Sequence, residues 1–289
     1  MASNAPTAVL FPGQGSHEEG MRDTVAAHAP DLLERCLELV GEDPFPRAAD
    51  STRFAQPAIF CASVARWRAA SLSDPPVAVA GHSLGEFSAL VAAGALDASE
   101  GLELVVERGR LMAEAGEHAG GGAMLAVLGG DDEAVHALAA KYDVTVANEN
   151  APGQLVLSGP TEALDAVTEE AQADGMRAME LGVAGAFHSP IVAPAEPAFR
   201  EALEKATFRE PQIQVISGMT AEPMTDPVDD LAGALTRPVR WKDTMQALDA
   251  LGAKRFLDAG PGQVLAKLVR RNLPDAEGGS LDLSETASA

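Results

Sequence analysis

The strongest chemical signal in the sequence is a serine held in a short turn between two glycines. Residues 81–85 (GHSLG) fit the pattern G-x-S-x-G, directly after the apolar run 77–80 and before a helical pattern over 86–92. This strand–turn–helix context is that of a nucleophile elbow, a turn too tight for side chains at the glycine positions. The backbone N–H of Leu84 would then point to the place where negative charge develops in acyl transfer. We therefore predict a nucleophilic Ser83, with a chance match in a chain rich in glycine and alanine as the alternative.

A serine hydroxyl is a weak nucleophile and needs a general base. Of the six histidines, His188 is the best candidate, because it ends the apolar run 183–187 and precedes a Ser-Pro pair that favours a helix start. His82 lies inside the elbow, where an orienting or packing role is the simpler interpretation. Taken alone, His188 would be interpreted as a buried core histidine. Together with the elbow, a catalytic pair with Ser83 becomes the better prediction.

The segments around these residues indicate how they are positioned. Short apolar runs that end at glycine or proline predict strands at 8–11, 77–80, 213–216 and 255–257, and helical periodicity predicts long helices that include 98–115 and 196–205. Apolar strands that alternate with helices are typical of an α/β fold with a largely parallel sheet. Ser83 and His188 can both face the carboxyl edge of such a sheet.

One stretch, after three consecutive glycines at 120–122, has a different order of predicted strands and helices from the rest of the chain. It predicts strands and helices in the order β-α-β-β-α-β, at 124–128, 132–141, 144–146, 155–157, 161–173 and 177–181. This order is the split pattern of a small ferredoxin-like domain. We therefore expect an α/β-hydrolase-like core formed by residues 1–120 and 184–273, with an inserted ferredoxin-like domain at 121–183. The small, polar and acidic segment 274–289 is expected to be disordered.

The composition favours some function classes over others. The 289 residues are 46% hydrophobic, enough for a sizeable core. Two cysteines, Cys36 and Cys61, rule out a disulfide framework or a cysteine zinc site and are typical of a reducing cytoplasm. A formal net charge of −22 argues against nucleic-acid binding. Because the start does not resemble a signal peptide and no apolar run approaches the roughly 20 residues that cross a bilayer, we expect a cytoplasmic protein without a membrane partner.

Several separated motifs match a known family in the expected order. The chain resembles malonyl-CoA:acyl carrier protein transacylases and the related acyltransferase domains of fatty-acid and polyketide synthases, from about residue 9 to residue 272. Besides the elbow, the matching motifs are 11–16 (FPGQGS), 56–58 (QPA), 108–112 (RGRLM), 122–124 (GAM), 148–154 (NENAPGQ), 186–189 (AFHS), 238–241 (PVRW) and 260–262 (GPG). Any one match could arise by chance, whereas an ordered set of this length would not.

The resemblance implies a catalytic role for each of five matched residues. Ser83 would carry the acyl group, and His188 would accept and return its proton. The backbone N–H groups of Gln14 and Leu84 would form the oxyanion hole. In this family a main-chain carbonyl orients the histidine, and Arg240 matches that position. The arrangement is adequate for thioesters, which are activated acyl donors and demand less stabilisation of the imidazolium than amides.

The resemblance also implies substrate-binding residues. Arg108 would bind the free carboxylate of a malonyl group, since a guanidinium matches both oxygens and a water-poor pocket requires a charged partner. Phe187, directly before the histidine, accompanies a preference for malonyl over its α-methylated form, although Gly185 here replaces a histidine found in many such domains. Core packing for Phe187 is an equal alternative. Positions in the family's cleft are matched by Gln56, Asn150 and, less directly, Asn148, with turn geometry as an equal alternative for the asparagines.

The implied reaction is a two-step transfer with ping-pong kinetics. Ser83 attacks malonyl-CoA, coenzyme A leaves, and the phosphopantetheine thiol of an acyl carrier protein takes the malonyl group. We expect no metal and no permanently bound cofactor, and a monomer whose partners are CoA thioesters and an acyl carrier protein. Lys267, Arg270 and Arg271 form a basic cluster that could contact an acidic carrier, with a solvated helix end as the simpler interpretation.

Two other function classes are alternatives. A hydrolase would use the same Ser83–His188 pair but let water take the acyl group, and Arg108 favours transfer of a dicarboxylic unit over this reading. A non-catalytic carrier-binding module would require a broken nucleophile or base, and both residues are intact. Fatty-acid and polyketide pathways fit the sequence equally.

Overall fold

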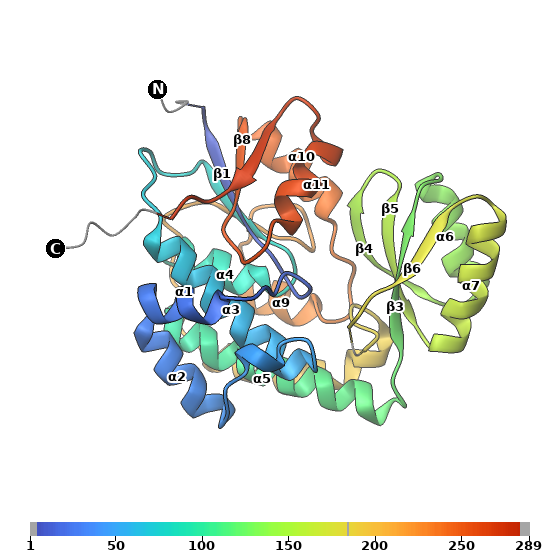
Figure 1. Cartoon of the computed structure of the whole chain (residues 1–289), viewed down its shortest axis with the longest axis horizontal. Helices are drawn as coiled ribbons and strands as arrows, with labels where there is room; N and C mark the ends of the chain where they lie inside the picture. Colours follow the sequence, from blue (N-terminus) through green and yellow to red (C-terminus); the bar gives the residue numbers. More distant parts are fainter. Residues whose placement is uncertain (1–4, 184, 284–289) are drawn as a thin grey trace.

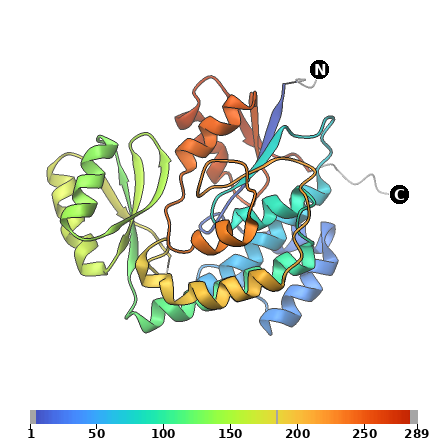
Figure 2. The same cartoon turned by 180° about the vertical axis from the view of Figure 1, so that it is seen from behind.

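The computed structural model describes residues 5–183 and 185–283 of the chain. Two sheets organise it: a five-stranded sheet in a larger unit and a four-stranded sheet in a smaller unit. Opposite views show the two units side by side, with the smaller one coloured green to yellow (Figure 1, Figure 2). No described helix is long and apolar enough to cross a bilayer.

The larger sheet is parallel throughout, with the strand order β7-β2-β1-β8-β9. Its strands are β1 (Thr7–Phe11), β2 (Ala78–Gly81), β7 (Val215–Ile216), β8 (Arg255–Asp258) and β9 (Glu277–Ser280). All of β2, and all of β1 except Thr7, are buried, as expected for parallel strands covered by helices on both faces. The prediction of an α/β fold with a largely parallel sheet is confirmed.

Alternate residues of the central strand β1 belong to two hydrophobic clusters, one on each face of the sheet. Val9 and Phe11 belong to the larger cluster, and Ala8 and Leu10 to the other. The helices of the first face are α1 (Met21–His28), α2 (Pro30–Val40), α3 (Thr52–Ala69), α4 (Gly85–Ala92), α5 (Ala98–His118), α8 (Glu196–Lys205) and α9 (Pro227–Gly233), with 3₁₀ turns η1 (Phe45–Arg47) and η2 (Pro190–Ala195). The second face is covered by α10 (Trp241–Ala250) and α11 (Val264–Asn272).

The expected disorder of residues 274–289 is wrong for 277–280, which form β9 beside β8. This segment reads EGGS and has no apolar alternation, so its pattern does not predict a strand. Backbone hydrogen bonds hold it instead, beginning with the Glu277 N–H donating to the Lys254 carbonyl at 2.9 Å. A Cβ at Gly278 would lie 3.0 Å from Val269 Cβ, so glycine lets this edge strand approach α11. Residues 284–289 lie outside the described part of the chain.

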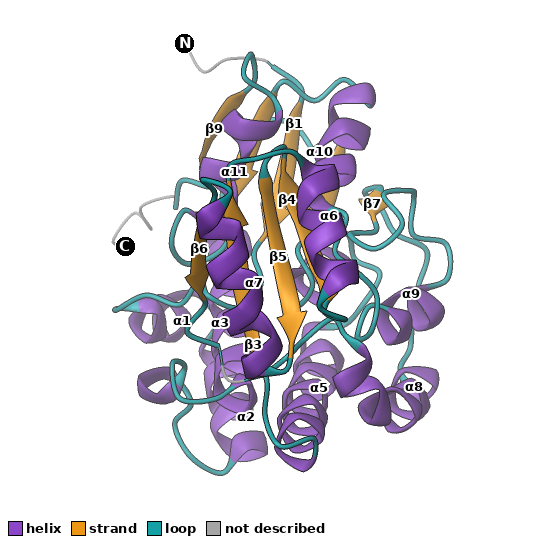
Figure 3. Cartoon of the chain, turned by 90° about the vertical axis from the view of Figure 1, so that its right-hand side faces the viewer, coloured by secondary structure: helices purple, strands orange, loops and turns teal. Residues whose placement is uncertain are grey.

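The smaller unit has the predicted order of elements, β-α-β-β-α-β. They are β3 (Ala123–Leu128), α6 (Asp132–Lys141), β4 (Thr145–Ala151), β5 (Gln154–Gly159), α7 (Thr161–Ala173) and β6 (Arg177–Glu180). The strands form an antiparallel sheet in the order β4-β5-β3-β6, and α6 and α7 cover one face (Figure 3). Through Met124 and Ala126, the other face joins the large cluster of the larger unit. The domain boundaries at 121 and 183 stay a prediction.

Strand β4 also joins the smaller unit to the larger one. The Val239 N–H donates to the Ala147 carbonyl, and the Val239 carbonyl accepts from the Glu149 N–H, both at 2.9 Å. Near the end of β4, the Asn272 side chain donates to the Asn150 carbonyl at 2.9 Å. β4 is therefore fixed on one side by β5 and on the other by the larger unit.

Candidate active site

The turn between β2 and α4 has the geometry predicted for a nucleophile elbow. Ser83 has φ 53°, in a region whose occupation costs a non-glycine residue on the order of 1–3 kcal/mol. A Cβ at Gly81 would overlap the backbone nitrogen of Glu86. A Cβ at Gly85 would overlap the Phe11 carbonyl oxygen. The turn therefore requires both glycines, and it holds Ser83 at the carboxyl edge of the sheet.

The predicted serine–histidine pair is in hydrogen-bond contact. Ser83 Oγ lies 2.8 Å from His188 Nε2, across 105 positions of sequence. On the far side of the ring, Nδ1 lies 2.7 Å from the Ala234 carbonyl oxygen and 3.1 Å from that of Arg237. Because carbonyls only accept, Nδ1 carries the proton and Nε2 can take the proton of Ser83. Burial, with the nearby charge of Arg108, lowers the pKa of His188 to about 3, so the resting ring is neutral at neutral pH.

The expectation that the Arg240 carbonyl orients this histidine is wrong. That carbonyl begins α10, where it accepts from the backbone N–H and the Oγ1 hydroxyl of Thr244, both at 2.9 Å. The orienting carbonyls belong instead to the turn after α9, since a helix end leaves carbonyls without partners inside the helix. Pro238, directly after Arg237, was the available signal, because proline prevents the helix from continuing there.

Arg108 reaches the same hydroxyl from α5. Its Nη2 donates to Ser83 Oγ at 3.0 Å, and its Nη1 donates to Gln56 Oε1 at 2.9 Å. Gln56 is fixed within α3, because its amide nitrogen donates to Thr52 Oγ1 at 2.8 Å.

Within the described part of the chain, the charge of Arg108 has no counter-ion. The residue is 2% exposed, and no carboxylate among the described residues forms an ion pair with it. Burial lowers its pKa to about 10, which still leaves it charged at neutral pH. Its Nε also has no hydrogen-bond partner in residues 5–183 and 185–283. A buried guanidinium in this state is a site for an anionic group, since an unpaired buried charge is unfavourable.

These groups surround a cavity of about 70 Å³ between the two units. Its lining residues are Gln14, Gln56, His82, Ser83, Leu84, Arg108, Met112, Met124, Asn148, Leu181, Val183, Phe187 and His188. Met124 and Asn148 come from β3 and β4 of the smaller unit, so the site needs both units. A cavity of this size favours a short acyl group over a long chain.

The two expected oxyanion donors both lie at this cavity. Among the described residues, the backbone N–H groups of Gln14 and Leu84 have no hydrogen-bond acceptor. Leu84 directly precedes α4, where N–H groups have no partner inside the helix. Both N–H groups are therefore available to an oxyanion, as the resemblance implies.

Only one of the two asparagines of β4 occupies the expected place. Asn148 lines the cavity, whereas Asn150 does not and lies with its Oδ1 2.9 Å from His82 Nε2. The His82 ring packs on Trp241, with 5.3 Å between the ring centroids. In a regular strand, residues two apart share a face, but β4 shifts register between Val146 and Asn148 and again after Glu149. The expectation that Asn150 lines the cleft is therefore wrong, and Asn148 does so.

Phe187 lines the cavity beside the base, as expected. Its ring packs closely on the backbone at Gly185, where an added Cβ would lie only 2.7 Å from the ring. Gly185 also has φ 147°, which L side chains rarely adopt. Glycine at 185 therefore permits this position of the Phe187 ring, which accounts for the departure from histidine.

Sequence reasoning missed Glu86, the acid that follows the elbow. It is buried, and its Oε1 accepts from the Gly218 N–H at 2.9 Å. Burial raises its pKa to about 8, so the side chain is neutral at pH 7. Glu86 thus connects α4 to the loop after β7 without adding a charge that would neutralise Arg108. The position of an acid directly after G-x-S-x-G was its only sequence signal.

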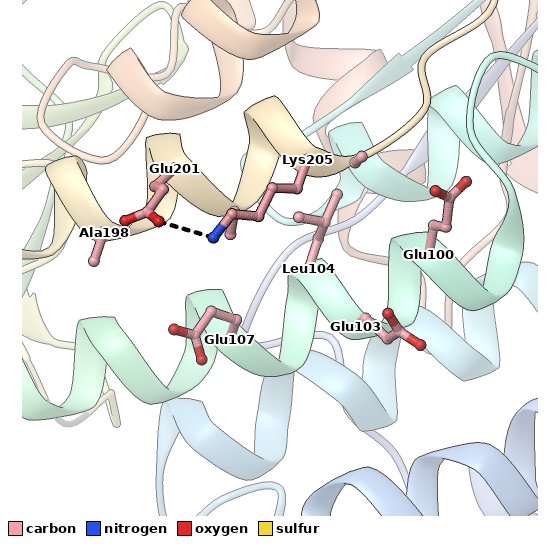
Figure 4. Close-up of a pocket in the computed structure, with 9 residues that line it drawn as sticks. Glu100, Glu103, Leu104, Glu107, Ala198, Glu201 and Lys205 are labelled. Carbon is pink, nitrogen blue, oxygen red and sulfur yellow. Dashed lines mark hydrogen bonds and ion pairs between the residues drawn. The ribbon is translucent and has the colours of Figure 1, made fainter.

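A larger hollow, of about 400 Å³, lies between α5 and α8 (Figure 4). Its polar residues are glutamates and one lysine, and three of the glutamates are already paired with cations of this chain. The pairs are Glu103 with Arg35 at 2.6 Å, Glu107 with Arg110 at 2.6 Å, and Glu201 with Lys205 at 2.8 Å. None of the described residues that line it is a serine, cysteine or histidine, so it does not compete with the Ser83 cavity as a catalytic site.

Known proteins are similar to this chain in sequence and in fold over nearly its whole length. The family model described as acyl transferase domain matches residues 9–284. The malonyl CoA-acyl carrier protein transacylase of Bacillus subtilis is 36% identical, over 91% of this chain and 89% of that protein. The polyketide biosynthesis protein ThaF of Burkholderia thailandensis is 38% identical over 94% of this chain, which spans only 25% of ThaF.

Solved structures give the same result. FabD from Acinetobacter baumannii is 34% identical and superposes with a TM-score of 0.87, covering 98% of this chain and 96% of FabD. A type II polyketide acyl-carrier protein in complex with its malonyl-transacylase (PlMCAT:AntF) contains a chain that is 31% identical, with 96% of both chains covered and a TM-score of 0.87. The resemblance predicted from the motifs is confirmed, and the chain belongs to the acyl transferase family.

Proposed function

We propose that the chain is a malonyl-CoA:acyl carrier protein transacylase. The observation that carries this proposal is the position of Arg108, whose Nη2 lies 3.0 Å from Ser83 Oγ with no carboxylate partner in the described part of the chain. A serine–histidine pair alone suits any acyl transfer. The buried cation selects an acyl group that has its own negative charge. A malonyl group has that charge and is short, in keeping with the small cavity.

In the first half-reaction, Ser83 Oγ attacks the thioester carbon of malonyl-CoA while His188 Nε2 takes its proton. The oxyanion forms between the backbone N–H groups of Gln14 and Leu84, which stabilise it by hydrogen bonds. When the oxyanion collapses, the C–S bond breaks and the imidazolium returns its proton to the sulfur. Coenzyme A leaves, and a malonyl ester remains on Ser83 with its carboxylate on Arg108.

The second half-reaction runs the same steps in reverse with a different thiol. His188 takes the proton of the phosphopantetheine thiol, the sulfur attacks the ester carbon, and Ser83 leaves with the proton returned to Oγ. No permanently bound cofactor is needed, because malonyl-CoA is the donor substrate and the thiol comes from the carrier. We propose that the enzyme acts in this way as a cytoplasmic monomer.

We also propose that the carrier protein contacts the exposed face of α11. Lys267, Arg270 and Arg271 are exposed there, at spacings of three and four positions that share one side of a helix. Val264, one turn earlier, is 42% exposed and adds an apolar contact. In a chain with a net charge of −22, such a local basic face gives an acidic carrier a place to bind. α11 also touches β4, the strand that bears the cavity residue Asn148.

Intact mass spectrometry tests the proposal. Incubation with malonyl-CoA should add one malonyl group to the protein, and phosphopantetheinylated carrier should then remove that group and gain it. The Ser83→Ala variant should show no adduct, and an adduct of equal extent on this variant would refute the nucleophile assignment. Free malonate released at the same rate with and without carrier would instead support the hydrolase alternative.

A further inference from the structure

The side-chain oxygen of Asn148 is a buried acceptor for which the described residues supply no donor. The residue is 8% exposed and lines the Ser83 cavity. Its Oδ1 is buried, and within the described residues no group donates a hydrogen bond to it. Buried polar atoms in native proteins are nearly always paired, and an unpaired one costs about 1–3 kcal/mol. The structure therefore points to a donor that arrives with a ligand.

The backbone holds this amide at the cavity. β4 pairs with β5 on one side, and its residues Ala147 and Glu149 exchange hydrogen bonds with Val239 on the other. Because the register shifts directly before Asn148, its side chain does not follow the alternation of faces in a regular strand. Bulges of this kind often re-aim side chains beside active sites. These two pairings hold the backbone at Asn148 in place beside the cavity.

The chemistry of the proposed substrate limits which of its groups can satisfy Oδ1. The malonyl carboxylate and the thioester carbonyl are acceptors, and both already have donors in Arg108 and the two backbone N–H groups. The thioester sulfur donates nothing. The nearest donors along the substrate are the amide N–H groups of the pantetheine arm, which coenzyme A and the carrier share.

We infer that Asn148 Oδ1 accepts a hydrogen bond from an amide N–H of the pantetheine arm. The inference rests on the proposed function and adds a substrate-positioning contact to it. Asn148 thereby binds the same arm in both half-reactions, first on coenzyme A and then on the carrier protein. Asn150, two positions further, provides a matched contrast, because its Oδ1 is engaged by His82 and not by the cavity.

The test uses malonyl-pantetheine and two analogues in which one or the other amide N–H is replaced by an ester oxygen. The rate of malonyl-Ser83 formation is measured by quenched-flow mass spectrometry. In the unaltered enzyme one analogue should react about tenfold more slowly, in line with the loss of one hydrogen bond to a buried acceptor. In the Asn148→Ala variant that difference should disappear. In the Asn150→Ala variant it should remain, although all three rates fall together.

The outcomes separate this inference from the proposed function. If the unaltered enzyme forms the malonyl adduct equally fast from all three thioesters, the inference is overturned while the proposed function stands. This comparison needs no variant, so it holds even if Asn148→Ala folds poorly. A tenfold difference that persists in a folded Asn148→Ala variant would also overturn the inference. Absence of any adduct from malonyl-pantetheine would overturn both.

Discussion

Replacement of Arg108 by alanine gives the sharpest test of how the site selects its acyl group. In the proposed acyl-enzyme complex the malonyl carboxylate lies in a buried cavity with Arg108 as its partner. Removing one member of a buried ion pair costs roughly 3–5 kcal/mol, and about 1.4 kcal/mol corresponds to a tenfold change in rate. Arg108→Ala should therefore lower kcat/KM for malonyl-CoA by roughly a hundredfold to a few thousandfold.

Acetyl-CoA provides the internal comparison, because an acetyl group has no carboxylate. It loses only the hydrogen bond from Arg108 to Ser83 Oγ, so its kcat/KM should fall by less than about tenfold. Acylation of Ser83 by each donor can be followed by quenched mass spectrometry. Arg110→Ala is the control, since Arg110 lies two positions away in α5 but is paired with Glu107 and Glu114 at the surface. Equal losses for malonyl-CoA and acetyl-CoA would refute the carboxylate argument.

Three further predictions follow from the charges described above. Because the pKa of His188 is lowered to about 3, kcat/KM for serine acylation should stay level as the pH falls from 8 to 5, and a decline centred near the ordinary histidine value would contradict this. The pKa of Glu86 is raised to about 8 in the folded state, above its ordinary value in the unfolded state. Between these two pKa values the folded state keeps a proton that the unfolded state has lost, so this group's contribution to stability falls as the pH rises. Glu86→Gln keeps the acceptor for the Gly218 N–H but does not ionise. The unfolding temperature of this variant minus that of the unaltered protein should therefore increase from pH 5 to pH 8. A difference that stays constant over this range would argue against a neutral Glu86. Charge reversal at Lys267 and Arg270 should raise KM for the carrier about tenfold at low salt, while serine acylation by malonyl-CoA changes little. Lys205→Glu in the α5–α8 hollow is the control. An equal rise in KM from this variant would show that only net charge matters.

The parts of the site that are set by local sterics could be predicted from the sequence. The elbow is such a case, because two glycines four positions apart, a preceding apolar strand and a following helix leave little choice for the position of Ser83. The helices α6, α7 and α8 begin and end at the predicted residues for a similar reason, since their apolar periodicity is interrupted by clear turn residues. The pairing of Ser83 with His188 does not follow from the parallel sheet alone, because His188 lies in the segment between β6 and η2 and not at the end of a strand of that sheet.

The errors have physical causes of their own. Every residue has a carbonyl, so the types of Ala234, Arg237 and Arg240 do not show which of them faces His188, and Pro238 indicates only where the helix cannot continue. The departure of Asn150 from the cavity, while Asn148 lines it, depends on a register shift in β4 that a period-two pattern does not contain. β9 is held to β8 by backbone pairing and an ion pair between Glu277 and Arg255 at 3.7 Å, and neither requires residues with a strand preference.

Among the residues that the structure describes, no carboxylate lies behind the His188 ring, and this has a consequence for the lifetime of the acylated protein. Two neutral carbonyls hold the imidazole in place, but they stabilise its positive form less than an aspartate would. Water, which gives up its proton reluctantly, gains little assistance from such a base, whereas a thiol ionises easily and needs little. A malonyl ester on Ser83 should therefore wait for the second thiol without being consumed by the solvent, so that the acyl unit is stored between two encounters.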